Sequence, residues 1–354
     1  MRPILSRCIS PSEPAEFINP YLVSGANSYG VHCDYCHKVA DVFLDEQSGL
    51  PKVNMPGVLS SDIRRPFPDD PDRYQIAFGT FDDPNVPEED TYLPMIRESK
   101  FCAPCHYGVF WDTTIYNSFG EWLASPYSDT ENGKTCQECH MPAPTIYDGA
   151  EVTNVAPGKG GIERDPMTIH AHLQRGSTDQ EFLKSALTMT AEVLQENDSI
   201  VVEVSLFNDN TGHHIPTDSP LRHLILLVEA EDSEGHELAL QNGNRLPEWC
   251  GIGNPKEGYY AGRPGTAYAK ILQELWTNVI PTAAYWNQTS LVSDNRIAAM
   301  QTANSSYIFS TNEASNITVS VTLIYRRAYR TLVDQKGWDA PDIIMAQQIL
   351  AVGR

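Results

Sequence analysis

The chain has 354 residues, which is long enough for two domains, and its hydrophobic content of 41% allows an ordinary core. Its formal net charge of −21 argues against nucleic acid and anionic membrane surfaces as partners, and an acidic, solvated surface accounts for that charge. Because no run of about 18 apolar residues occurs, the sequence predicts no membrane-spanning helix.

The first residues, MRPILSRCIS, lack the apolar stretch of a secretory signal segment. Arg7 stands directly before Cys8, which is unlike a lipid-attachment site. We therefore expect either a mature form or a chain whose upstream part is missing. Cys8 and Cys250 stand apart from the other cysteines, and both a disulfide and a pair of buried thiols fit them.

Six of the eight cysteines form three pairs, each with two residues between the cysteines and a histidine directly after them. These are CDYCH (Cys33, Cys36, His37), CAPCH (Cys102, Cys105, His106) and CQECH (Cys136, Cys139, His140). Three such pentapeptides in a chain poor in cysteine and histidine indicate covalent attachment of three haem c groups. Both thiols of a pair form thioethers with one porphyrin, and the imidazole that follows becomes the proximal ligand of its iron.

Other cysteine chemistry explains this pattern less well. Two CxxC pairs can build a four-cysteine zinc site, but a third pair and three trailing histidines are then left over. A thioredoxin-like dithiol needs one CxxC in a βαβ context, whereas these three pairs lie in proline-rich loops. Structural disulfides leave His37, His106 and His140 unexplained.

A six-coordinate iron needs a second axial ligand, and seven histidines lie outside the three motifs. His32 directly precedes Cys33, so it cannot bind the far side of the haem attached there, but it can ligate a neighbouring haem. His170 and His172 stand two apart in IHAHLQRG. In an extended segment both side chains project to one side, which suits two adjacent haems.

The turn NTGHHIPT supplies two further candidates, His213 and His214, in a rigid setting between glycine and proline. We expect distal ligands among these two, His32, His170 and His172. His223 and His236 lie in or beside strand-like runs and are expected to be surface or packing residues. Methionine is a rival ligand, but no methionine stands in a distinctive motif.

Residues 1–178 contain all three motifs and are rich in proline, glycine, aspartate and aromatic residues, with weak periodicity. Residues 54–74 predict irregular loop, and residues 115–125 predict a short helix that ends before Pro126. Three porphyrins would supply the apolar mass that this half lacks. We therefore expect a haem-packed, loop-rich domain over residues 1–178, with short helices, whose folding depends on haem attachment.

Alternating apolar residues begin near residue 185 and predict strands at 188–193, 199–207 and 316–327, and a strong apolar run followed by the turn SEG predicts another at 222–232. Short strands separated by turns indicate an antiparallel, immunoglobulin-like β-sandwich over residues 185–354. Residues 341–352, PDIIMAQQILAV, predict a C-terminal helix with Pro341 in its first turn. The predicted fold class is therefore mixed: a haem-packed half, then an antiparallel sandwich and a closing helix.

The segments GVHCDYCHKVADV, FCAPCHYGVF with YNSFGEWLASPY, GKTCQECHMP and NTGHHIPTDSPLRHL resemble multihaem c-type cytochromes of bacterial and archaeal respiratory chains. The resemblance covers nearly the whole chain. It implies a haem-bearing N-terminal part, a C-terminal β-sandwich, and His213 as a distal ligand. HLQRG is similar to an H-x-F-P-G element, which supports His172. Relatives often have a further CxxCH upstream, so we expect that a haem has been lost here or that the beginning has been cut off.

These features predict an exported protein, extracellular or periplasmic, that relays electrons through three bis-histidine haems between redox partner proteins or extracellular acceptors. Some extracellular relatives polymerise into conductive filaments, so a homo-oligomer or filament with haem contacts between subunits is a further expectation. The alternative is a multihaem oxidoreductase for nitrogen-oxide or hydroxylamine chemistry, which needs an open haem and an acid–base group beside it. A docking subunit of a larger complex is a third reading. The spare histidines favour the electron carrier, for which we predict no catalytic residue.

Overall fold

The structure is a computed structural model that describes residues 33–52, 60–64, 77–81, 91–159, 161–311, 314 and 316–353. The chain divides into two compact units, residues 1–175 and 176–354, which are described separately below. In the described part of the chain, no helix is long and apolar enough to cross a bilayer. His32 and Cys8, two residues singled out in the sequence, lie outside the described residues.

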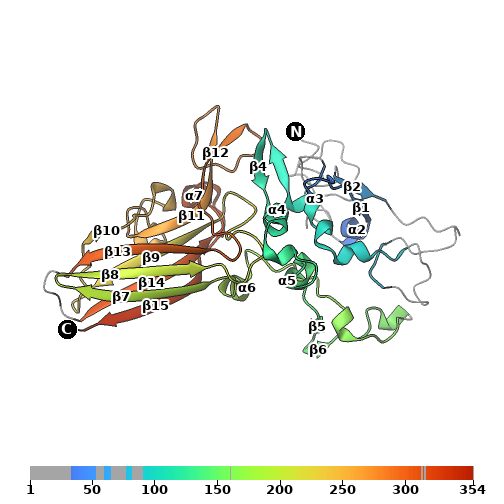
Figure 1. Ribbon diagram of the computed structural model, residues 1–354, viewed down its shortest axis with the longest axis horizontal. Helices are drawn as coiled ribbons and strands as arrows, with labels where there is room; N and C mark the ends of the chain where they lie inside the picture. The colour runs from blue at the N-terminus through green and yellow to red at the C-terminus, as the bar shows by residue number, and fades with distance from the viewer. Residues whose placement is uncertain are drawn as a thin grey trace. The chain divides into compact units, whose positions relative to one another are not determined.

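The first unit consists of short helical turns and two-stranded hairpins joined by loops (Figure 1). Its α-helical turns are α2 (Cys33–Cys36), α3 (Ala103–His106), α4 (Ser118–Leu123) and α5 (Cys136–His140). Its 3-10 turns are η5 (Pro94–Arg97), η6 (Ser99–Phe101), η7 (Pro126–Ser128), η8 (Pro157–Lys159) and η9 (Pro166–Thr168). Its antiparallel hairpins are β1 (Val39–Val42) with β2 (Ser61–Ile63), β3 (Gly108–Phe110) with β4 (Thr113–Tyr116), and β5 (Ile146–Tyr147) with β6 (Ala150–Glu151).

The predicted short helix before Pro126 is confirmed as α4, which ends two residues early because a second turn starts there. The Ser125 side chain accepts a hydrogen bond from Tyr127 N at 3.2 Å and thereby caps η7. Proline favours the first position of such a turn, where its missing N–H costs no hydrogen bond. The helical segment is therefore interrupted between α4 and η7 because Ser125 caps a new turn there.

The described apolar core of the first unit is small. Its largest cluster of buried side chains has four members, Tyr35, Val39, Val42 and Met95, packed beneath the first motif. The corresponding cluster of the second unit, more of which is described, has 25 members. Because burial of apolar area is the main stabilising contribution to folding, the described side chains of the first unit alone supply little of it.

The second unit begins with α6 (Gln180–Lys184) and continues as two antiparallel sheets in a sandwich-like arrangement (Figure 1). One sheet has the order β10-β13-β8-β7 and the other β12-β11-β9-β14-β15. The bounds are β7 (Thr188–Glu196), β8 (Ser199–Phe207), β9 (His223–Glu231), β10 (Leu240–Asn242), β11 (Gly265–Glu274), β12 (Thr289–Asp294), β13 (Thr302–Ser310), β14 (Ile317–Arg326) and β15 (Ile343–Val352). The turns η10 (Glu248–Cys250) and η11 (Pro255–Glu257) precede β11, and α7 (Arg330–Lys336) connects β14 to β15. The four predicted strands are thus confirmed as β7, β8, β9 and β14.

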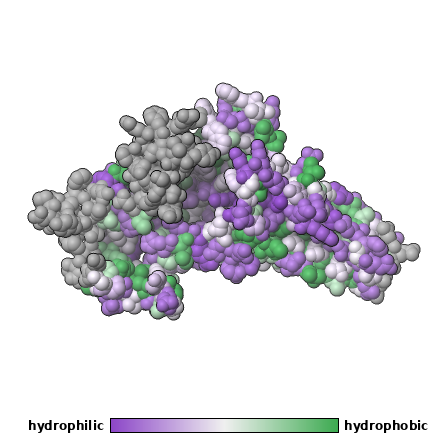
Figure 2. Space-filling model, turned by 180° about the vertical axis from the view of Figure 1, so that it is seen from behind, coloured by the Kyte–Doolittle hydropathy of each residue, from purple (hydrophilic) through white to green (hydrophobic). Residues whose placement is uncertain are grey.

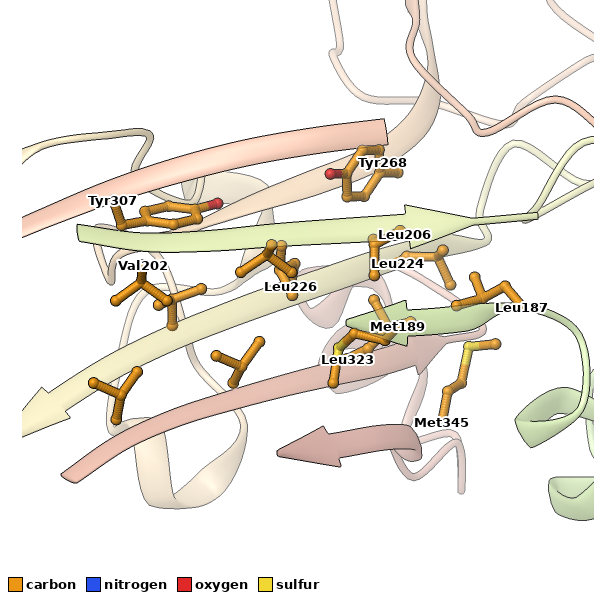
Figure 3. Close-up of a cluster of buried hydrophobic side chains, with 14 of the residues drawn as sticks. Leu187, Met189, Val202, Leu206, Leu224, Leu226, Tyr268, Tyr307, Leu323 and Met345 are labelled. Carbon is orange, nitrogen blue, oxygen red and sulfur yellow. The ribbon is translucent and has the colours of Figure 1, made fainter. Parts of the chain in front are cut away.

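Side chains from the two sheets point toward one another and form one continuous core (Figure 3). Val202 and Leu206 of β8 meet Leu224 and Leu226 of β9 and Leu323 of β14, and all five are buried. Alternate residues of each strand point inward because successive side chains of a strand lie on opposite faces. This alternation is what made these strands recognisable in the sequence.

The outer face of the five-stranded sheet is covered as well. Ile225 and Leu227 of β9 pack there with Ile324 of β14 against Leu246 and Cys250 from the segment that follows β10. Burial on both faces explains why RHLILLVEAED is a nearly continuous apolar run and does not alternate. The Cys250 thiol is fully buried, and burial raises its pKa to about 12.

The predicted C-terminal helix is wrong, because residues 343–352 form the strand β15. β15 pairs with β14 along its whole length, from Ile317↔Val352 to Tyr325↔Ile343. Ile343 and Met345 point into the core, whereas Ile344 is exposed. The open edge of β14 therefore decides the conformation, since tertiary pairing overrides the weak helix preference of AQQ.

Candidate functional site

Each CxxCH motif folds as one helical turn. In the first motif, Cys33–Cys36 form α2, and the whole third motif forms α5. In the second motif, Cys102 is the N-cap residue of α3, which contains the rest of the motif. Residues three and four positions apart lie on the same side of a helical turn. Every motif therefore presents two thiols and the imidazole that follows on one side, which is the arrangement that one porphyrin edge and its iron require.

Local side-chain chemistry fixes the third turn. Thr135 and Glu138 form a capping box: Glu138 N donates to Thr135 Oγ1 at 3.3 Å, and Thr135 N donates to Glu138 Oε2 at 2.6 Å. The buried Gln137 side chain donates from Nε2 to the carbonyls of Ile96 and Glu98, both at 2.8 Å. These bonds tie α5 to the segment that leads into the second motif.

The three motifs are neighbours within the first unit. The Cys102 thiol hydrogen-bonds with Cys136, and Cys36 is close enough to Cys102 to interact with it electrostatically. The hydrogen bond with Cys136 and burial raise the pKa of the Cys102 thiol, and the same bond lowers the pKa of Cys136 to about 7. His106 also interacts electrostatically with Cys136. Porphyrins attached at these positions would lie close together.

Backbone carbonyls orient two of the motif histidines. His37 Nδ1 donates to the carbonyl oxygen of Phe78 at 2.6 Å, and Phe78 N donates back to the His37 carbonyl at 2.8 Å. His140 Nδ1 donates to the carbonyl oxygen of Arg175 at 2.6 Å, and Arg175 N donates back at 3.2 Å. A carbonyl only accepts, so each neutral ring carries its proton on Nδ1 and its lone pair on Nε2. In this tautomer an imidazole binds iron through Nε2.

One candidate distal histidine faces a motif histidine. The rings of His172 and His37 have centroids 6.2 Å apart, and their planes are 27° from parallel. Two imidazoles that bind one metal from opposite sides, each with a metal–nitrogen distance of about 2.0 Å, have centroids roughly 6 Å apart. The segment that contains His172 is held beside the third motif, because Ala171 N donates to the Pro142 carbonyl at 2.9 Å. The distance between the two rings therefore agrees with His37 and His172 as ligands of one iron.

The other candidate histidines are placed less completely. His170 Nδ1 donates to the Met141 carbonyl at 2.8 Å, so its neutral ring also carries the lone pair on Nε2. His213 and His214 lie in the second unit, in the connection between β8 and β9. His213 Nδ1 donates to the His214 carbonyl at 2.9 Å, and the His213 carbonyl accepts from Asn208 Nδ2 at 2.9 Å.

The remaining histidines agree with the sequence-based expectation that they are packing or surface residues. His223 is fully buried, with its ring stacked at 5.2 Å on Tyr329 and edge-on at 5.1 Å to Trp249. His236 is exposed and pairs with Asp232 at 3.2 Å. Among the residues that the structure describes, no three His, Cys, Asp or Glu side chains are grouped in a way that could hold a metal ion directly.

Sequence reasoning missed the groups that orient these rings. Phe78 and Arg175 act through their backbone carbonyls, and Met141 does the same for His170. Any residue type supplies a carbonyl, so no sequence signal marks these positions. The hydrogen bonds of Gln137 depend on the burial of its side chain, and nothing in CQECH predicts that burial.

Comparison with known proteins supports the fold. No protein-family model matches the chain, and no curated protein matches its sequence. Among solved structures, the chain is similar to a penta-haem cytochrome c552 from Thermochromatium tepidum, with a TM-score of 0.61 and 18% sequence identity over 92% of this chain and 78% of that chain. A second match, to the Fcho1 Mu homology domain from Danio rerio, has 9% identity over 48% of this chain and 44% of that chain, and its TM-score of 0.18 carries no argument. This chain therefore shares its fold with a multihaem c-type cytochrome.

Proposed function

We propose that this protein transfers electrons through three haem c groups attached at Cys33 and Cys36, at Cys102 and Cys105, and at Cys136 and Cys139. The observation that carries the proposal is three adjacent helical turns, each with two thiols and an imidazole on one side. The small apolar core among the described residues of the first unit agrees with it, since porphyrins would add apolar mass there. The fold similarity to a penta-haem cytochrome agrees with it.

When bound, each haem supplies an iron that changes valence by one electron. His37, His106 and His140 would each hold one of the three irons, and His172 would be a second ligand of the iron held by His37. The candidate second ligands of the other two irons are His32, His170, His213 and His214. Ligation of each iron by two histidines would suit a relay of single electrons.

The protein influences how strongly the histidines bind iron and what the reduction potentials are. The Phe78 and Arg175 carbonyls accept from Nδ1 of His37 and His140, which fixes the rings and raises their basicity toward iron. The formal charge of −21 favours the ferric state and lowers the reduction potentials. The same charge attracts a basic redox partner or positively charged acceptor surface.

Haem attachment through CxxCH agrees with a place outside the cytoplasm, extracellular or periplasmic. In this setting the acceptor is a partner protein or an extracellular acceptor. The haem turns lie side by side, so electrons pass between them within one molecule. Catalysis is not part of the proposal.

The test is to replace His172 in the haem-loaded protein and to follow the spin state of the irons. We expect wild-type spectra to be purely low-spin, without carbon monoxide binding. His172→Ala should convert one haem in three to a high-spin form that binds carbon monoxide, because one distal ligand is lost. His236→Ala, at an exposed histidine, is the matched control and should leave the spectra unchanged.

Two results would contradict the proposal. A wild-type protein with a high-spin haem that binds carbon monoxide would favour the multihaem oxidoreductase, which needs an open iron. A His172→Ala protein that keeps purely low-spin spectra would remove His172 as a ligand and leave the attachment of haem untouched.

A further inference from the structure

The hairpin formed by β11 and β12 extends beyond the sandwich. β11 pairs with β9 only from Gly265 to Ala269, whereas Lys270 to Glu274 pair with β12. Residues 270–294, which we call the arm, therefore extend past His223, the first residue of β9 (Figure 1). Within the arm the chain folds back once more, because Thr282 N donates to the Leu272 carbonyl at 3.0 Å. A two-stranded ribbon is only marginally stable in water unless one of its faces is covered.

The surface of the arm differs from the rest of the protein. Residues 275–293 contain no Asp, Glu, Lys, Arg or His, although 20% of the chain is Asp, Glu, Lys or Arg. Seven of the 21 exposed large hydrophobic side chains in the described chain lie on the arm: Leu275, Trp276, Val279, Ile280, Trp286, Leu291 and Val292. Trp276 is 83% exposed. Hydrophilic residues cover most of the described surface in Figure 2, so this uncharged apolar arm is an exception.

The arm also contains an unprotected sheet edge. β12 is the outermost strand of its sheet, and no described strand pairs with its outer side. Natural edge strands are protected by charge, proline, bulges, short length or a covering element. β12 ends on one charged residue, Asp294, and its pairing with β11 shifts register between Ile271 and Leu272, but residues 289–293, TSLVS, have neither charge nor proline.

The other three edges of the sandwich are protected. β7 carries Glu192 and Glu196, and β10 has three residues. β15 is tied to β7 through Gln348, whose side chain accepts from Ala191 N at 2.9 Å and donates to the Met189 carbonyl at 3.0 Å. β12 differs from these edges because it lies on an arm that has no charged residue over residues 275–293.

We propose that the arm binds the arm of a second copy of this chain, with the two β12 edges paired antiparallel about a two-fold axis. Charge limits the surface at which two copies of this chain can meet. Two copies that each carry −21 repel one another over most of their surfaces, so they can meet only where charge is absent. A two-fold axis brings residues of the same facing opposite one another, so antiparallel pairing centred on Leu291 places Asp294 opposite Gln288, and the two carboxylates lie at opposite ends of the ladder. Arg296 further compensates Asp294 at 2.7 Å.

The area available agrees with a stable dimer. If all seven side chains are covered, at most about 700 Å² of surface leaves water in each copy, near the roughly 800 Å² per partner of a standard interface. Main-chain hydrogen bonds between the two β12 edges add register, as in other cases of strand addition. A two-fold contact of this kind is closed, so it gives a dimer and does not by itself give a filament.

Sedimentation velocity of the full haem-loaded protein, over about 1 to 100 μM, tests the pairing. We expect the wild type to reach twice the monomer mass as concentration rises. Leu291→Lys places a charge at the centre of the ladder and should weaken self-association by at least about tenfold. Trp276→Ser should weaken it in the same direction. Trp338→Ser replaces an exposed tryptophan outside the arm and should leave association unchanged.

A wild type that stays monomeric, or a Leu291→Lys protein that associates as well as the wild type, would overturn the proposal. Co-sedimentation with phosphatidylcholine vesicles, lost in Trp276→Ser while the protein stays monomeric, would assign the arm to a neutral lipid surface and would also overturn it. The mass readout does not depend on electron transfer. Dimers with too few haems would therefore count against the proposed function alone.

Discussion

Replacing His223 should change how the stability of the second unit depends on pH. His223 is fully buried at the start of β9, and its Nε2 has no hydrogen-bond partner in the described structure. Burial, with a smaller contribution from the charge of Arg326, lowers the pKa of His223 to about 3. In the unfolded chain the same group has a pKa of about 6.5. His223→Phe keeps an aromatic ring between Tyr329 and Trp249 and removes the titration.

The sign follows from which state binds the proton. Between pH 6.5 and 3 the unfolded chain binds a proton at His223 and the folded chain does not, so folding loses stability as pH falls through this window. Each pH unit contributes about 1.4 kcal/mol, so lowering the pH from 7 to 4.5 should cost the wild type roughly 3 kcal/mol at this group. His223→Phe lacks this titration, so it should not lose this stability. The carboxylates are the same in both proteins, so their contribution cancels in the comparison.

Urea denaturation followed by the β-sheet signal in circular dichroism, at pH 7 and pH 4.5, measures the difference. The stability of His223→Phe relative to the wild type should rise by about 3 kcal/mol between the two pH values. His236→Phe, at an exposed histidine, is the control and should show little such change. If the difference between His223→Phe and wild type is the same at both pH values, His223 is not buried in its neutral form, and the packing described here is wrong.

Three further substitutions test other parts of the fold. Arg326→Leu should destabilise the second unit by about 3–5 kcal/mol in the same urea assay, because Arg326 is buried against Asp342 at 2.6 Å and its loss leaves that carboxylate unpaired; a loss below 1 kcal/mol would refute the buried pair. Thr135→Ala removes the N-cap of α5 and should cost about 1 kcal/mol, read as faster hydrogen exchange of the third motif; unchanged exchange would contradict the capping box. Met345→Ala should cost about 2–5 kcal/mol and Ile344→Ala, at an exposed neighbour, under about 0.5 kcal/mol; equal losses would argue against β15 as a strand.

Sequence reasoning worked best where chain-local chemistry determines the outcome. The spacing of CxxCH matches one helical turn, so each motif could be read without knowledge of the fold. β14 could be read from Ile317, Val319, Val321 and Leu323, whose alternation follows from burial on one face. The role of the motif cysteines and histidines in binding haem stays a prediction.

It failed where distant partners decide. The segment 343–352 becomes a strand because β14 lies alongside it, and that neighbour is invisible in PDIIMAQQILAV. Five histidines were candidate distal ligands, but only the folded chain brings His172 to 6.2 Å from His37. The carbonyl of Phe78, which orients His37, is 41 residues away in the sequence. Such long-range placements depend on loop geometry that local patterns do not encode.

The central claim is covalent attachment of haem at three places, and intact-mass spectrometry of the denatured, purified chain tests it most directly. The account predicts a polypeptide heavier than its sequence by three haem groups, with iron retained after denaturation because thioethers do not dissociate. The bare polypeptide mass, or a mass that rises only by zinc under native conditions, would contradict it.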